Sequence, residues 1–209
     1  LLAQVHLIAG EPNAAIPLVR EARSRWLDES ASTVLVQLGL LEATLSFYTQ
    51  SHIAAAEKLA AIYHRTDLEP IAERRSQYLA ASILGSRIAC MHLLSAWHLN
   101  TQVPDELLAE SRRRLSRARP RPAWWLTIQN SIESLVTGSP NAAIEMLQEL
   151  LERSPPSDRL AEALSWGLLA KCQDEAKKGS TRARNQAKSI LDEIGAAPPP
   201  ELMLLQARS

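Results

Sequence analysis

The chain has 209 residues, of which 46% are hydrophobic, 22% are charged and 4% are aromatic. Lysine plus arginine equals aspartate plus glutamate, 23 each, so no overall charge attracts nucleic acid or acidic lipid. No run of about 18 apolar residues occurs, which argues against a membrane span. Cys90 and Cys172 are far apart and fit no C-x-x-C motif, so we expect two reduced core thiols in a cytoplasmic protein.

Apolar spacing predicts helices along the whole chain and no strand. In the first half, we expect helices over residues 1–9, 13–27, 32–48 and 51–63, one that starts at Pro70 and ends near Gly85, and one from 88 to 99. In the second half, we expect helices over residues 104–119, 124–136, 140–151, 160–176 and 181–194, and a short one after the prolines at 198–200. That makes about twelve helices with short links.

Short links make neighbouring helices antiparallel, so they pair as hairpins. One hairpin cannot bury its apolar face alone, and stacking solves that problem. The expected fold is therefore all-α: a right-handed α-solenoid of about six stacked antiparallel helical hairpins, in one domain over residues 1–209. Because Leu1 already lies in a helical pattern, we expect a piece of a longer protein.

A ten-residue segment occurs twice. Residues 10–19 read GEPNAAIPLV and residues 138–147 read GSPNAAIEML, with Gly, Pro, Asn, Ala, Ala and Ile at the same places. A weaker echo starts at Ser51, and adjacent echoes lie about 40 residues apart, in the range of helical-hairpin repeats. The alternative is that unrelated hairpin turns converged on one solution.

These segments resemble tetratricopeptide (TPR) repeats, in which small residues let two helices approach and a glycine turns the corner between them. The positions that match well are Leu2, Ala3, Gly10, Ala15, Val19 and Ala22. The second copy matches in part, at Ser131, Gly138, Ala143 and Leu147. Leu150 departs from the pattern, and residues 70–120 carry no family motif, so the likeness covers about half the chain. It implies a groove lined by the first helix of each hairpin.

Residue patterns for catalysis are missing. No histidine lies in H-E-x-x-H or at metal-ligand spacing from a cysteine, no G-x-S-x-G occurs, and the seven glycines make no phosphate loop. We expect no enzyme activity, no cofactor and no metal.

The TPR resemblance implies a protein–protein interaction module that docks a peptide or helix of a partner in its groove. The alternative is an effector-sensing domain, because such hairpins also resemble the sensor region of large ATP-dependent bacterial transcription activators related to the maltose regulator. A small-molecule effector would then be the ligand.

One segment is locally basic. Residues 111–121 carry six arginines and are followed by two tryptophans. Such a patch can hold an acidic peptide or phosphate groups. The alternative is a solvated helix end, with the tryptophans packed into the next hairpin. The candidate partner-binding residues are Arg112, Arg113, Arg114, Arg117, Trp124 and Trp125.

Overall fold

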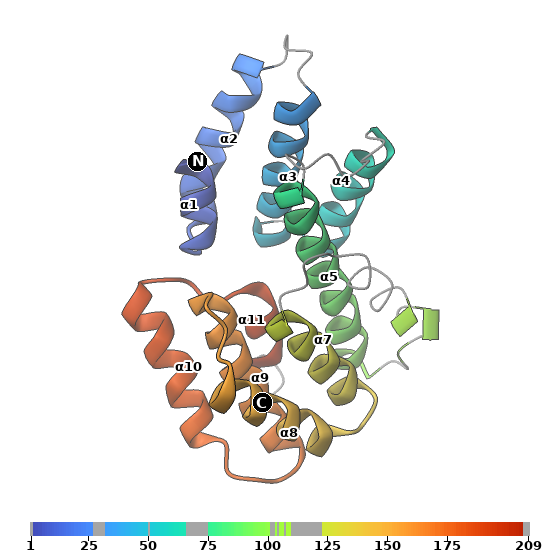
Figure 1. The fold of residues 1–209 in the computed structure, drawn as a ribbon, viewed down its shortest axis with the longest axis vertical. Coiled ribbons are helices and arrows are strands. Elements are labelled where there is room, and N and C mark those ends of the chain that lie inside the picture. The colour runs from blue at the N-terminus through green and yellow to red at the C-terminus, as the bar shows by residue number, and fades with distance from the viewer. Residues whose placement is uncertain are drawn as a thin grey trace.

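The computed structural model describes residues 2–26, 32–49, 51–65, 75–100, 103, 105–106, 108–109 and 123–206. Every regular element in these ranges is a helix: α1 Leu2–Ile8, α2 Pro12–Trp26, α3 Ser32–Thr49, α4 His52–Arg65, α5 Arg75–His98, α7 Ala123–Val136, α8 Pro140–Arg153, α9 Arg159–Glu175, α10 Thr181–Ile194 and α11 Pro200–Gln206. The all-α prediction is confirmed (Figure 1). None of the described helices is both long enough and apolar enough to cross a membrane.

One predicted boundary is wrong. The sequence suggested that a helix ends near Gly85, but α5 continues through this glycine without a break. Glycine inside a helix costs only about 1 kcal/mol relative to alanine. Leu84 and Ile88 on either side are buried in the core, and their packing offsets that cost.

The duplicated segment forms the same turn twice. Gly10 follows α1 and Gly138 follows α7, and both have a positive φ, 73° and 81°. In each turn the glycine N–H donates to the carbonyl three residues back, and the next N–H donates to the carbonyl five residues before it, at 3.2 and 2.8 Å in both copies. This is the Schellman pattern, which favours glycine at the left-handed position. The repeated letters therefore encode one helix-to-helix turn.

Helices that follow one another in the chain pack together. The contacting pairs include α1–α2, α2–α3, α3–α4, α4–α5, α5–α7, α7–α8, α8–α9 and α9–α10. Alternate helices also touch, as α1–α3, α3–α5 and α7–α9. In Figure 1, α1 to α4 form the upper part of the molecule, α7 to α11 form the lower part, and α5 runs from one to the other.

The core is divided in the same way. Leu84 and Ile88, near the middle of α5, belong to a cluster with α3 and α4. Leu93 and Leu94, farther along α5, belong to the larger cluster formed with α7, α8, α9, α10 and α11. A third cluster joins α1, α2 and α3. Because α5 contributes to two clusters, it fixes the upper and lower parts relative to each other.

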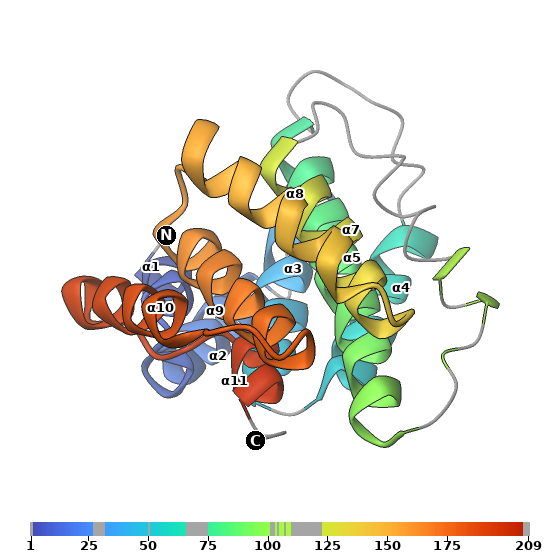
Figure 2. The same cartoon turned by 90° about the horizontal axis from the view of Figure 1, so that it is seen from below.

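The last described helix returns to the middle of the molecule. α11 packs on α5 and α9 (Figure 2). Its Leu202 lies against Gly167 of α9, where an added Cβ would be 2.0 Å from a leucine methyl carbon. In the segment that leads into α11, Ala197 approaches the turn after α1 so closely that a Cβ on Gly10 would lie 2.7 Å from its backbone nitrogen. The turn after α1 is therefore in contact with the segment that precedes α11.

Candidate functional site

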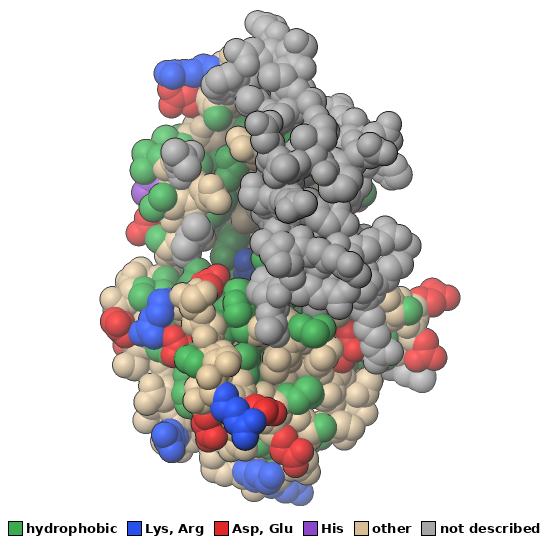
Figure 3. Space-filling model, in the orientation of Figure 1, with side chains coloured by type: hydrophobic (Ala, Val, Ile, Leu, Met, Phe, Trp, Pro, Cys, Tyr) green, Lys and Arg blue, Asp and Glu red, His purple; other side chains and the backbone are tan. Residues whose placement is uncertain are grey.

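A cavity of about 440 Å³ lies between the upper and lower parts of the molecule, where the surface is hollowed (Figure 3). We call it the central cavity. It is lined by Gln4, Leu7, Gln37, Leu40, Leu41, Thr44, Tyr48, Ile83, Arg87, Trp124, Trp125, Asp158, Leu160, Ala161, Leu164 and Pro199. All helical residues of this set come from α1, α3, α5, α7 and α9. None comes from α2, α4, α8 or α10.

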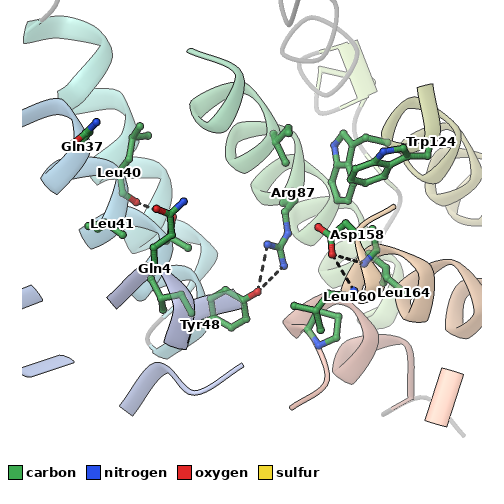
Figure 4. Close-up of a pocket in the computed structure, with 16 residues that line it drawn as sticks. Gln4, Gln37, Leu40, Leu41, Tyr48, Arg87, Trp124, Asp158, Leu160 and Leu164 are labelled. Atoms are coloured by element: carbon green, nitrogen blue, oxygen red, sulfur yellow. Dashed lines mark hydrogen bonds between the residues drawn. The ribbon is translucent and has the colours of Figure 1, made fainter. Parts of the chain in front are cut away.

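The central cavity has two unlike walls. On one side, the side-chain amides of Gln4 and Gln37 lie beside leucines of α3, and on the other side the apolar side chains of Trp124 and Leu164 lie near Asp158 (Figure 4). Both glutamines are exposed at the rim, whereas Leu164 is buried. Side-chain amides both donate and accept hydrogen bonds. The cavity can thus hold an apolar group on one side and a hydrogen-bonding group on the other.

Arg87 of α5 lies between the two walls and is the centre of a buried polar cluster. Its Nε donates to Glu201 Oε1 at 2.7 Å and its Nη2 donates to Glu201 Oε2 at 3.0 Å. The Tyr48 hydroxyl lies 3.4 and 3.5 Å from the two terminal nitrogens. The Phe47 ring centroid is 4.8 Å from the guanidinium carbon, a distance that allows a cation–π contact.

Arg87 and Glu201 form a buried ion pair, in which each charge compensates the other. The Glu201 side chain has no exposed surface and that of Arg87 is 18% exposed. The carboxylate and the Tyr48 hydroxyl raise the pKa of Arg87 above its ordinary value, against the opposite effect of burial. This two-bond pair joins α5 to α11, and the contact of Arg87 with the Tyr48 hydroxyl adds α3.

A second polar chain runs beside this pair. Ser86 Oγ donates to Gln129 Oε1 at 2.7 Å, and Gln129 Nε2 donates to Glu133 Oε1 at 3.0 Å. The Cys90 thiol is nearby, and its pKa is raised by burial and by the carboxylates of Glu201 and Glu133. A buried thiol with a raised pKa is a poor nucleophile. Cys90 and Cys172 are both free and buried, as the sequence predicted.

The two tryptophans of the predicted partner site both line the central cavity. Their rings meet edge to face, with centroids 5.7 Å apart and planes at 87°. Trp125 is only 3% exposed, and its indole nitrogen is buried without a hydrogen-bond partner in the structure. An unpaired buried donor is unfavourable. A ligand with an acceptor atom would relieve that cost if it reached the indole nitrogen.

The four arginines of that predicted site, Arg112, Arg113, Arg114 and Arg117, lie outside the described residues. Partner binding by the basic segment therefore stays a prediction.

Sequence reasoning missed the polar side chains that mark the cavity. Arg87 and Glu201 are 114 residues apart, and neither belongs to a motif. Glu201 directly follows the proline that starts α11, so in sequence it looks like an ordinary acid at a helix start. Gln4 and Gln37 belong to no sequence motif or pattern that would mark them as cavity residues. Only the bend that brings α11 back to α5 pairs these residues.

Among the described residues, no group of three or more histidine, cysteine, aspartate or glutamate side chains is placed to hold a metal ion. His52 and His92 meet edge to face, with ring centroids 4.4 Å apart. Comparison of the chain with protein-family models, with curated proteins and with solved structures finds no match. The geometry of the central cavity is therefore the basis for a functional proposal.

Proposed function

We propose that this chain is a non-catalytic binding module, built as a TPR-like right-handed solenoid of helical hairpins, that holds a peptide segment of a partner protein. The observation that carries the proposal is the origin of the cavity walls: α1, α3, α5, α7 and α9, the first helices of successive hairpins, supply every helical lining residue. We call the surface that these five helices face the inner groove. A stack of hairpins presents such a surface to a partner.

The chemistry of the central cavity supports a peptide as occupant. A peptide has backbone N–H and C=O groups that the amides of Gln4 and Gln37 can meet, and side chains that the apolar wall can bury. The indole N–H of Trp125 is one further donor. Partner segments are commonly recognised in this way, with main-chain hydrogen bonds for affinity and pockets for specificity.

A variant with a larger side chain in the central cavity tests this proposal. Leu41 is half-buried and lines the cavity, so Leu41→Trp should fill space that a peptide needs. Leu99 is 71% exposed and does not line the cavity, so Leu99→Trp makes the same chemical change elsewhere. We would select a displayed library of linear peptides against the wild-type chain. Enriched peptides should bind the Leu99→Trp variant as they bind the wild type, and they should not bind the Leu41→Trp variant. Peptides that bind all three proteins equally would reject the inner groove as the docking site.

A second candidate is a small-molecule effector site. The volume of about 440 Å³ favours it, because sites for small ligands typically measure about 300–1,000 Å³. It agrees with the resemblance to the sensor region of bacterial transcription activators. A panel of small metabolites, measured by thermal shift, separates the two candidates, since a ligand raises the melting temperature by mass action. A shift that Leu41→Trp abolishes would favour the effector; no shift with any compound would favour the peptide.

A further inference from the structure

The position of α11 departs from the order of the other helices. Three first helices pack on both helices of the hairpin before them: α3 contacts α1 and α2, α5 contacts α3 and α4, and α9 contacts α7 and α8. By that rule, the helix after α10 would pack on α9 and α10. Instead, α11 packs on α9 and α5, two helices that face the inner groove. It therefore lies against two of the helices that supply lining residues of the central cavity.

The contacts of α11 are those of an amphipathic ligand helix. Glu201, Leu202 and Leu205 are 0%, 1% and 2% exposed, whereas Met203 between them is 57% exposed. Residues three and four apart share one face of a helix, so the acid and two leucines make a single docking face. Glu201 accepts two hydrogen bonds from Arg87, and Leu202 packs against Gly167, which has no side chain.

We propose that α11 is an internal occupant of the inner groove and that the external partner is an amphipathic helix with the same docking face. The partner carries a carboxylate directly before a leucine and a second leucine three positions later. It takes the place of α11 on Arg87 and Gly167, so the free chain is self-inhibited. This inference rests on the proposed binding function and names the chemistry of the partner.

The exchange that we propose requires the rest of the chain to stay folded when α11 leaves its buried site. α11 is short. It has seven residues, and a helix this short is not stable by itself. Hollows border it at both ends: Pro199 lines the central cavity, and Leu202 and Leu205 line a second hollow of about 810 Å³ between α9, α10 and α11. Tethering gives α11 an effective concentration in the millimolar range. A longer partner helix with additional contacts outcompetes it.

Peptide binding to the full chain tests the inference. The probe is a fluorescein-labelled peptide with the sequence of residues 196–209, followed by anisotropy. Glu201→Gln in the chain weakens internal docking and leaves the groove intact, so it should tighten probe binding by about tenfold or more. Met203→Gln changes an exposed residue of the same helix and should leave binding at the wild-type level. A probe with both leucines replaced by alanine should not bind.

A change in the groove itself provides the opposite control. Gly167→Ala places a methyl group where Leu202 packs, so it should weaken both α11 and the probe. Combined with Glu201→Gln, it should abolish the gain in probe affinity. Hydrogen exchange over residues 200–206 should be faster in Glu201→Gln while the helical circular-dichroism signal remains.

Three results would overturn the inference. One is unchanged exchange in α11 of the Glu201→Gln chain, and another is faster exchange without tighter probe binding. The third is global unfolding of both Glu201→Gln and Leu205→Ala, which would make α11 an integral part of the core. If library peptides still bind the inner groove in those cases, the proposed function stands and only the role of α11 is lost.

Discussion

The buried pair of Arg87 and Glu201 makes a sharp energetic prediction. Glu201→Leu removes a carboxylate that accepts two charged hydrogen bonds. Among the described residues, Arg87 keeps the Tyr48 hydroxyl at 3.4–3.5 Å and the ring of Phe47, neither of which carries a negative charge. Removing one partner of a buried pair costs about 3–5 kcal/mol because the other charge remains uncompensated. With Arg87 only 18% exposed, water replaces little of the loss. We expect the free energy of unfolding to fall by about that amount.

The double variant separates the pair from the packing of α11. Arg87→Met combined with Glu201→Leu leaves no unpaired charge, so it should recover about 2 kcal/mol or more of the loss seen in Glu201→Leu alone. Urea unfolding followed by circular dichroism measures all variants. Glu145→Leu, at an exposed position of α8, should change stability by less than about 0.5 kcal/mol. A loss below about 1 kcal/mol in Glu201→Leu, or no recovery in the double variant, would refute the reasoning.

Three further predictions concern other parts of the fold. Ala15 and Ala143 are fully buried, so glutamate at either position should lower stability by about 3 kcal/mol or more; thermal melting shows this, and Ala142→Glu, at an exposed site, should melt like the wild type. Burial lowers the pKa of His52 from 6.5, so the unfolded state takes up a proton first as pH falls below 6.5, and native stability decreases there. His52→Gln should show a smaller decrease between about pH 7.5 and 5.5 by urea unfolding, and equal decreases would contradict the assignment. Burial raises the pKa of Cys172 to about 12, so its thiol should resist a disulfide reagent at about pH 8 in the native chain and react once the chain unfolds; rapid reaction of native protein would show that this part of α9 opens.

Helix positions could be read from the sequence because they depend on neighbours a few residues away. The two Gly-x-Pro-Asn segments predicted turns, and both glycines take the left-handed conformation with the same two hydrogen bonds. Gly85 shows the limit of that reasoning. Glycine follows the end of a helix at Gly10 but lies inside a helix at Gly85. The buried packing around α5 explains why the helix continues at Gly85.

The candidate site could be read only in part. The groove lined by first helices was an implication of the TPR resemblance and stays a prediction; the helices that line the central cavity are α1, α3, α5, α7 and α9. The sequence drew attention to Trp124 and Trp125 as neighbours of a basic segment, whereas the structure makes them cavity residues. Arg87 and Glu201 were not singled out, because each is an unremarkable charged residue until the other is beside it.

The sequence by itself predicted most of the described helices and the two glycine turns, since these depend on backbone hydrogen bonds and side-chain periodicity within about five residues. Only the tertiary structure decided that α11 turns back onto α5 and α9, and that the turn at Gly10 meets Ala197. The contacts of α11 with α5 and of Gly10 with Ala197 join residues more than a hundred positions apart. Their energy comes from buried charge and close packing at points that no local pattern marks.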